Sequence, residues 1–208
     1  MDQRLNSKSK LAEVRDYKTD PMFSTVTTTM HGNLAIGSKD GSIRLYKQVG
    51  QNAKTLLPGM GQPIISVDVS YDGRWVLATT KAYLLIMPTF VEGTEQSGFA
   101  KSMGKQKPTP TKLQVSARDL VRYGISAPDF TAARFNTFST SVGRETNIVT
   151  STGSYLVTWK FGDVLQGKSS KYRIRKLGSK PVDTQYVHDN EKQILVTDAK
   201  SVEMTNKR

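Results

Sequence analysis

The residue types that most often carry out acid–base chemistry are sparse in this sequence and stand in predicted turns. The two histidines, His31 and His188, both fall between predicted strands. A histidine in a turn usually hydrogen-bonds the neighbouring backbone, so we favour a structural role for each over proton transfer. Asp40 and Asp72 each precede a glycine, where an aspartate side chain accepts hydrogen bonds from backbone N–H groups. Using them as a general acid and base would require two separate turns to converge, so we predict that the chain is not an enzyme.

Metal and nucleotide chemistry also lack the residues that they need. The sequence has no cysteine, which excludes disulfides and thiolate metal sites. Two lone histidines without clustered carboxylates do not make a zinc site. The segment Gly59-Met60-Gly61 has two glycines, but no third glycine and no helix follow it, so neither dinucleotide nor P-loop geometry is available. We therefore expect no cofactor and no metal.

Basic residues give the strongest chemical signal, because 30 Lys and Arg against 18 Asp and Glu leave a net charge of +12. Such a charge fits an anionic partner, or a chain whose acidic counterparts lie elsewhere in a larger assembly, and we favour the second explanation. Two groups without acidic neighbours stand out. The first group contains Lys101, Lys105, Lys107 and Lys112. The second group contains Lys168, Lys171, Arg173, Arg175, Lys176 and Lys180.

Alternation within the second group predicts a strand over 172–176. Side chains of a strand point alternately to its two faces, so Arg173 and Arg175 would share one face while Tyr172 and Ile174 occupy the other. A basic face of this kind suits nucleic acid or an anionic membrane. An edge strand that charge protects from unwanted pairing explains it at least as well.

The elements that would position these residues are short strands in a repeated order. Over residues 23–46, an alternating strand, a turn, a second strand, an Asp-Gly turn and a third strand follow one another. Asp-Gly between strands is a strong hairpin signal, because glycine tolerates the positive φ of tight turns. The same order returns over residues 64–87, 131–159 and, more weakly, 182–204. Outer strands are expected near 54–57 and 172–176.

The repeats divide the chain into two parts. Residues 1–20 form a polar segment, for which the end of a preceding blade is one interpretation. Residues 21–208 hold the repeats. An insertion at about 92–127 interrupts them, and a capping pattern at Ser116 predicts a short helix within it that stops at Gly124. Without the insertion, one repeat takes roughly 40–50 residues, as in WD-type blades. We predict an all-β, WD40-like β-propeller of about four blades that forms an incomplete arc of a larger propeller.

The two tryptophans lie inside predicted strands. Trp159 ends a third strand, where WD repeats place their signature tryptophan, and Tyr46 holds the matching position in the first repeat. We predict that Trp75 and Trp159 pack between blades and do not act as stacking platforms for a ligand.

The chain begins without an apolar segment, and no apolar run approaches the length of a membrane span. Absence of cysteine suits a reducing compartment. We expect a soluble protein of the cytoplasm or the nucleus.

Several runs resemble a known family. They are Asn52-Ala-Lys-Thr55, Pro58-Gly-Met-Gly61, Asp72-Gly-Arg-Trp75, Gly98-Phe99, Met103-Gly104 and Ile148-Val-Thr-Ser-Thr-Gly153. Together they resemble the C-terminal WD-like domain of the vacuolar import and degradation protein 27 family, and more closely its plant relatives, the defective embryo and meristems proteins. The resemblance implies a β-propeller without established catalytic activity, linked to vacuolar import and protein degradation or, in plants, to development.

These observations favour a non-catalytic scaffold that binds a partner protein through loops on a rigid surface. Charged or polar residues near strand ends that match the family are the candidate contacts, namely Lys54, Arg74, Arg134 and Asn136. The alternative is a basic surface that binds nucleic acid or an anionic membrane, and the salt dependence of binding distinguishes the two.

Overall fold

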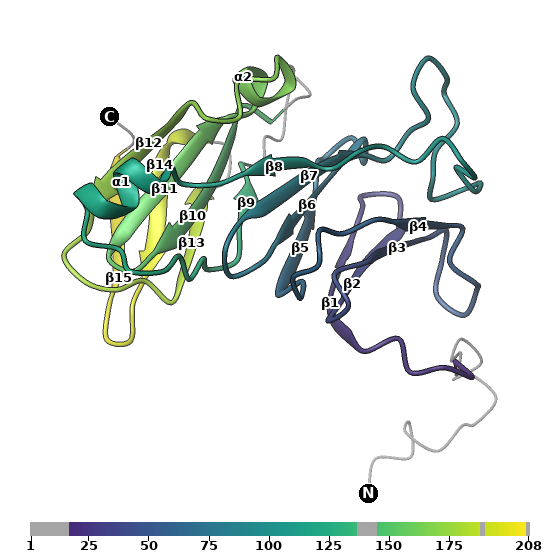
Figure 1. Ribbon diagram of the computed structural model, residues 1–208, viewed down its shortest axis with the longest axis horizontal. Coiled ribbons are helices and arrows are strands. Elements are labelled where there is room, and N and C mark those ends of the chain that lie inside the picture. The colour runs from purple at the N-terminus through teal and green to yellow at the C-terminus, as the bar shows by residue number, and fades with distance from the viewer. Residues whose placement is uncertain (1–16, 137–144, 188–189, 207–208) are drawn as a thin grey trace, which may run out of the picture.

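The structure is a computed structural model that describes residues 17–136, 145–187 and 190–206 (Figure 1). Within these ranges, the strands form four antiparallel sheets. In each sheet the strands pair in chain order, as in a meander, and we number the sheets as blades 1 to 4. Neither helix of the described ranges has the length and apolar character that crossing a bilayer requires. His188 and residues 1–16 lie outside the described residues.

Each blade begins with its innermost strand. Blade 1 contains β1 (Phe23–Thr28), β2 (Leu34–Ser38), β3 (Ile43–Tyr46) and β4 (Thr55–Leu57). Blade 2 contains β5 (Ser66–Val69), β6 (Trp75–Thr79), β7 (Leu84–Pro88) and β8 (Thr111–Leu113). Blade 3 contains β9 (Arg134–Phe135), β10 (Asn147–Thr152), β11 (Tyr155–Lys160) and β12 (Tyr172–Lys176). Blade 4 contains β13 (Asp183–Val187), β14 (Asn190–Thr197) and β15 (Val202–Asn206).

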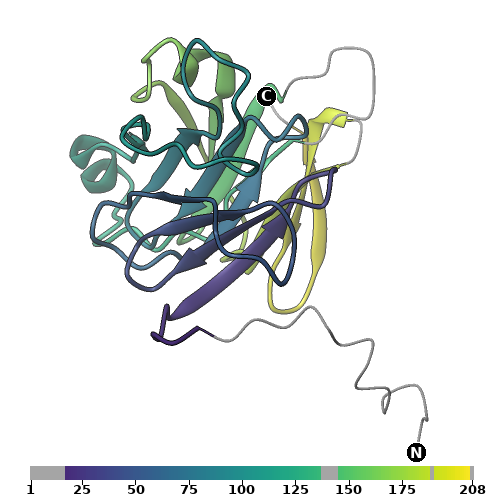
Figure 2. The same cartoon turned by 90° about the vertical axis from the view of Figure 1, so that its right-hand side faces the viewer.

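The blades follow one another along the longest axis of the molecule, from blade 1 on the right of Figure 1 to blade 4 on the left. Figure 2 looks along this row from the side of blade 1 and shows that the strands of successive sheets are turned relative to one another. The innermost strands of neighbouring blades contact each other, β1 with β5, β5 with β9 and β9 with β13. Sheets whose innermost strands contact one another, with the other strands following outward in order, are the arrangement of a β-propeller.

Alternation along the strands gives the inner blades two apolar faces. In blade 2, Val76 and Met87 are buried against blade 1, whereas Leu77 and Ile86 are buried against blade 3. In blade 3, a cross-strand row runs from Phe135 through Ile148 and Trp159 to Tyr172 and packs toward blade 2. The burial of apolar area between consecutive sheets is therefore what holds the arc together.

The arc is open. Blades 1 and 4 lie at opposite ends of Figure 1, and no strand pairing among the described residues joins them. We call the outer sides of these blades the end faces. Val26 and Leu56 on blade 1 are 58% and 42% exposed, and Val202 and Met204 on blade 4 are 69% and 59% exposed. The predicted all-β fold and the incomplete propeller arc are thus confirmed.

Two elements differ from what the sequence indicates. The outer strand β8 lies inside the segment that we expected to be an insertion. The sequence before it is polar and contains prolines, so it does not predict a strand. Helix α2 (Phe161–Leu165) was not predicted, and it has no side-chain cap to signal its start. Helix α1 (Ala117–Arg122) begins where the capping pattern predicts a helix, with the Asp119 N–H donating to Ser116 Oγ at 3.2 Å. Gly124 follows it with a φ of +66°, which favours glycine at a helix end.

Candidate protein-interaction groove

A long connection between β7 and β8, residues 89–110, projects beyond the end of blade 2 (Figure 1). We call it the arm. Its base is fixed by Thr89, whose fully buried side chain donates from Oγ1 to the Gly73 carbonyl at 2.5 Å. The Thr89 N–H donates to the Arg74 carbonyl at 2.8 Å, and its carbonyl accepts from the Gly98 N–H at 2.6 Å. The arm therefore leaves the blade in a defined direction.

Two apolar side chains anchor the middle of the arm. Phe99 and Met103 are each 2% exposed and belong to the core between blades 1 and 2. Gly98 precedes them at a close approach, because a Cβ there would lie 2.9 Å from Met103 Sδ and 3.0 Å from the Thr89 carbonyl oxygen. Only glycine fits this place without a shift of its neighbours. The family resemblance of Gly98-Phe99 and Met103-Gly104 thus has a packing reason.

The arm and the end of blade 2 enclose a groove of about 880 Å³. We call it the arm groove. Its apolar lining includes Trp75, Pro88, Phe90 and Val91, and its charged lining consists of Arg74, Lys107 and Glu92. Apolar side chains thus lie beside a few charged ones, as they do in many binding sites.

Arg74 is the residue of the groove with the most defined contacts. Its guanidinium carbon lies 4.6 Å from the centroid of the Phe90 ring, and Nη1 lies 3.4 Å from Glu95 Oε2. Its backbone N–H donates to Asp72 Oδ1 at 2.9 Å. The Arg74 side chain is 44% exposed and that of Glu95 is 86% exposed. An ion pair this exposed contributes little to stability.

Trp75 connects the groove to the next blade. Its ring meets that of Phe161 in α2 edge to face, with centroids 5.7 Å apart and an interplanar angle of 87°. Trp75 is half-buried, and its backbone N–H donates to Ser70 Oγ at 2.9 Å. One side of the indole packs between blades, as we predicted, while the residue also lines the groove.

The other candidate contacts are distributed differently. Arg134 Nη1 donates to Ser66 Oγ at 2.9 Å and so joins blade 3 to blade 2. Asn136 is 1% exposed, and its Oδ1 accepts from the Asn147 N–H at 2.6 Å. Lys54 is half-buried before β4. Asn136 is buried and Arg134 is half-buried, and the polar groups of both make contacts inside the arc. Of the four candidates, Arg74 alone lines the arm groove.

Two carboxyls at the junction of blades 2 and 3, the half-buried Asp68 and the buried Glu145, were missed by sequence reasoning. Burial raises the pKa of Asp68, which accepts from the Phe135 N–H at 2.8 Å. Burial also raises the pKa of Glu145, which accepts from the Tyr71 N–H. Single acidic residues inside a strand or before one carry no signal that distinguishes them from exposed ones. Asp68 thus joins the innermost strands β5 and β9, while Glu145 joins the segment before β10 to the turn between β5 and β6.

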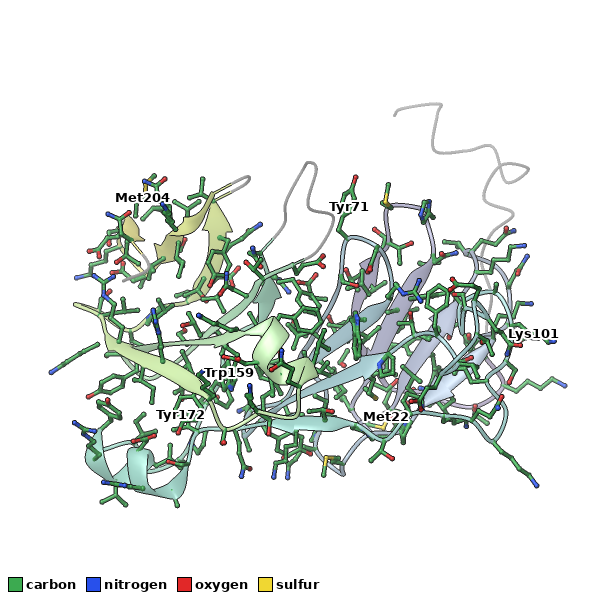
Figure 3. The ribbon with its side chains drawn as sticks, turned by 90° about the horizontal axis from the view of Figure 1, so that it is seen from above. Met22, Tyr71, Lys101, Trp159, Tyr172 and Met204 are labelled. Atoms are coloured by element: carbon green, nitrogen blue, oxygen red, sulfur yellow. The ribbon has the colours of Figure 1, made fainter. Side chains whose placement is uncertain are left out.

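The two predicted basic groups do not merge into one surface. Figure 3 shows Lys101 on the arm at one end of the molecule and Tyr172 of β12 toward the other. In the first group, Lys107 lines the groove, Lys101 and Lys105 are exposed on the arm, and Lys112 Nζ lies 4.7 Å from the Tyr83 ring centroid. Of the two basic groups, only the first therefore contributes a lysine to the groove.

Residues of the second group have their own local partners. Arg173 and Arg175 share a face, as the alternation predicts, but that face looks toward blade 4, where Arg175 Nη1 donates to the Asn206 carbonyl at 2.6 Å. Lys171 pairs with Asp163 at 3.0 Å, and Lys180 pairs with Asp129 at 3.9 Å. The remaining two residues, Lys168 and Lys176, are exposed.

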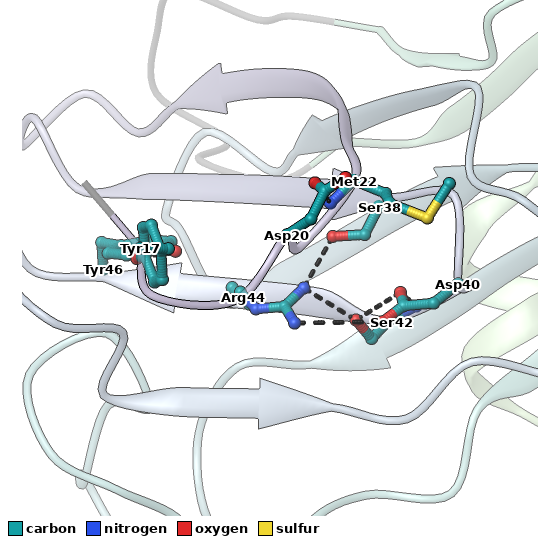
Figure 4. Close-up of polar contacts among 8 residues, drawn as sticks. All are labelled: Tyr17, Asp20, Met22, Ser38, Asp40, Ser42, Arg44 and Tyr46. Atoms are coloured by element: carbon teal, nitrogen blue, oxygen red, sulfur yellow. Dashed lines mark hydrogen bonds and ion pairs between the residues drawn. The ribbon is translucent and has the colours of Figure 1, made fainter. Parts of the chain in front are cut away.

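The aspartates before glycine act in turns. Figure 4 shows Asp40 accepting from Ser42, at 2.9 Å from its N–H and 2.7 Å from its hydroxyl, and Arg44 donating to Ser38 Oγ at 2.6 Å. Burial opposes ionisation of Asp40, but the hydrogen bonds from Ser42 outweigh it and lower the pKa of that carboxyl. Among the described residues, no group of three or more His, Asp or Glu side chains is arranged to hold a metal ion.

Comparisons with known proteins show what this chain is similar to. A family profile described as the VID27 C-terminal WD40-like domain matches residues 1–208. The chain is 34% identical over 215 residues to vacuolar import and degradation protein 27 of Schizosaccharomyces pombe, covering 100% of the chain and 27% of that protein. It is 34% identical over 209 residues to the protein of the same name in Saccharomyces cerevisiae, covering 94% of the chain and 26% of that protein.

The chain thus spans about a quarter of the length of these relatives. Among solved structures, it is similar to the β-propeller domain of Myceliophteria thermophila Cps50 (Swd1), with a TM-score of 0.56 and 11% identity. The match covers 88% of this chain and 52% of that one. The blades of this chain therefore align with about half of that β-propeller domain.

Proposed function

The chain belongs to the VID27 family, and from this premise we propose that it is a non-catalytic propeller scaffold that binds a partner protein through the arm groove. The observation that carries the proposal is the groove itself, about 880 Å³, in which apolar side chains lie beside two cationic side chains and the carboxylate of Glu92. Binding surfaces are often loops that a rigid framework positions, and here the framework is the stack of blades.

The preformed shape of the arm supports this role. Phe99 and Met103 fix the arm in the core, and Thr89 fixes its base. A partner that binds a preformed loop does not have to order it, which removes part of the entropy that binding otherwise loses. The aspartates that precede glycine are already engaged in turns, which favours binding over catalysis at this end of the arc.

The cellular setting follows from the relatives. Their name links them to vacuolar import and degradation, and we extend that link to this chain as part of the proposal. We propose the cytoplasm or the nucleus as its location. Imaging of a fluorescent fusion together with vacuolar and nuclear markers tests the location.

A pull-down with charge-reversed bait tests the binding role. Arg74→Glu reverses one charge at the groove, while Lys180→Glu makes the same change on the loop between β12 and β13, beside Asp129. We expect quantitative mass spectrometry to find at least one partner that is retained by the wild-type chain and the Lys180 variant but lost with the Arg74 variant. Equal recovery of all partners with both variants contradicts the proposal.

The alternative remains the binding of nucleic acid or an anionic membrane. It is favoured by the net charge of +12 and by the exposed arm lysines Lys101 and Lys105. Each phosphate that a lysine or arginine neutralises steepens the loss of affinity with salt. Titration of the chain with an oligonucleotide and with anionic vesicles at two salt concentrations therefore separates this function from protein binding.

A further inference from the structure

Building on the proposed function, we propose that the arm groove recognises a partner segment in which a carboxylate stands next to an apolar side chain, and that Glu95 occupies the place of that carboxylate in the free protein. The partner is thus defined by its chemistry as an acidic peptide segment with an aromatic or large aliphatic residue. Glu95 acts as an internal competitor of this segment.

The position of Arg74 supports the carboxylate half of the proposal. Its guanidinium lies over the Phe90 ring at 4.6 Å and faces Glu95 Oε2 at 3.4 Å. Stacking on an aromatic ring restricts the orientation of a guanidinium, while its planar set of donors matches a carboxylate. The groove therefore presents a preoriented carboxylate-binding group that already holds a carboxylate of its own chain.

The groove lining supports the apolar half. Trp75, Pro88 and Phe90 line the groove with Arg74, and Val91 at the base of the arm is 3% exposed. An apolar side chain placed against these residues would leave water while its neighbouring carboxylate meets Arg74. Aromatic residues near a cation are favoured anchors in protein interfaces.

The turn that carries Glu95 is built by its neighbours. Thr94 Oγ1 donates to the Val91 carbonyl at 3.0 Å and accepts from the Gln96 N–H at 3.1 Å. This geometry holds Glu95 beside Arg74, yet the Glu95 side chain is 86% exposed. Glu95 thus screens Arg74 weakly, and a peptide carboxylate can displace it without unfolding the turn.

Lys107, in the part of the arm that leads to β8, adds a second cation to the groove. It stands in the first basic group, next to the exposed Lys105. Cations at the edge of an interface raise the association rate of an anionic partner more than they slow its release. Because Glu92 also lines the groove, the two cations outnumber one carboxylate, and the groove favours an acidic peptide.

The experiment measures fluorescence anisotropy of a labelled peptide, Gly-Ser-Asp-Phe-Asp-Glu-Gly, titrated with the full chain. We expect Arg74→Gln to weaken binding about tenfold, because a charge-assisted hydrogen bond is lost. We expect Glu95→Gln to strengthen binding roughly threefold, because an exposed ion pair no longer competes. Lys180→Gln removes an equal charge elsewhere and should leave the affinity unchanged.

The opposite signs of the two groove variants keep the test independent of folding, because a misfolded variant cannot bind more tightly. Unchanged or weaker binding by Glu95→Gln overturns the role of Glu95. A control peptide with Asn and Gln in place of its acidic residues, and another with Ala in place of Phe, should each bind at least fivefold more weakly. Equal affinity for either control overturns the recognition of a carboxylate beside an apolar residue.

A single-stranded RNA oligonucleotide serves as the competing class of ligand. RNA binding that depends on Arg74, with no binding of the acidic peptide, overturns the inference in favour of nucleic acid. Failure of the peptide in this assay, together with a partner protein that still requires Arg74 in the pull-down, rejects the proposed peptide chemistry and leaves the scaffold function standing. If the peptide does not bind and no partner protein requires Arg74 in the pull-down, both the peptide chemistry and the scaffold function are rejected.

Discussion

Trp159 at the junction of blades 2 and 3 provides a quantitative test of the stacked-blade architecture. Its side chain is 0% exposed, and its ring lies 5.6 Å from that of Tyr172 and 6.5 Å from that of Phe130, between centroids. Its indole N–H donates to the Ser169 carbonyl at 3.1 Å. We expect Trp159→Ala to remove all of these contacts at once and to leave a cavity between two sheets.

The expected loss is about 3–5 kcal/mol in the free energy of unfolding, as for other large aromatic side chains in cores. Aromatic contacts beyond area burial and one buried hydrogen bond, roughly 1 kcal/mol each, are included in that range. Since whole domains are stable by about 5–15 kcal/mol, the variant should unfold at a clearly lower urea concentration. Far-UV circular dichroism is the suitable probe, because it does not depend on the tryptophan that is removed.

Two control variants define the result. Trp159→Phe keeps an aromatic ring but loses the hydrogen bond, so it should lose less than the alanine variant. Val121→Ala on α1, where the valine is 83% exposed, should change stability by less than about 0.5 kcal/mol. If Trp159→Ala loses no more than Val121→Ala, Trp159 does not hold two blades together and the packing argument fails.

Three further predictions concern the junction of blades 2 and 3, the arm and the end faces. Burial raises the folded-state pKa of Asp68, so the contribution of this carboxyl to stability should be largest below its unfolded value of 3.8 and be lost as the pH rises through the folded pKa; in urea unfolding, Asp68→Asn should therefore gain stability relative to wild type as the pH rises from about 4 to 7. Gly98→Ala should destabilise the arm by about 1–3 kcal/mol, since the added Cβ meets Met103 and the Thr89 carbonyl; limited proteolysis should then cut within 89–110, and unchanged resistance contradicts this. Replacing exposed Val26 and Met204 by threonine should reduce binding of an apolar dye at the end faces, with stability within about 0.5 kcal/mol of wild type.

Much of the fold is predictable from the sequence because its signals are local. Alternation indicates the inner strands of the blades, with Asp-Gly turns as a further signal in blades 1 and 2, and β4 and β12 lie where outer strands are expected. Strand β8 is different, since three residues with a central lysine carry too short a pattern to be recognised. Helix α2 has five residues and lacks a capping side chain, so it leaves no boundary signal.

The candidate site is predictable only in part. Arg74 is identified by its place near a strand end, but the groove beside it depends on how Phe99 and Met103 enter the core, which is a tertiary property. The pairing of Arg74 with Glu95 spans 21 positions and has no periodic pattern. Asn136 also stands near a strand end and is polar, so the sequence predicts an exposed contact residue. Long-range packing buries it instead.

Amide hydrogen exchange of the full chain, with and without a saturating amount of the acidic phenylalanine peptide, tests most directly whether the arm groove is the binding surface. We predict slower exchange in peptides that cover residues 90–96 and 106–109, and no change around residues 177–182. Protection confined to the end faces or to β12, or none at saturation, would contradict the assignment of the binding surface to the arm groove.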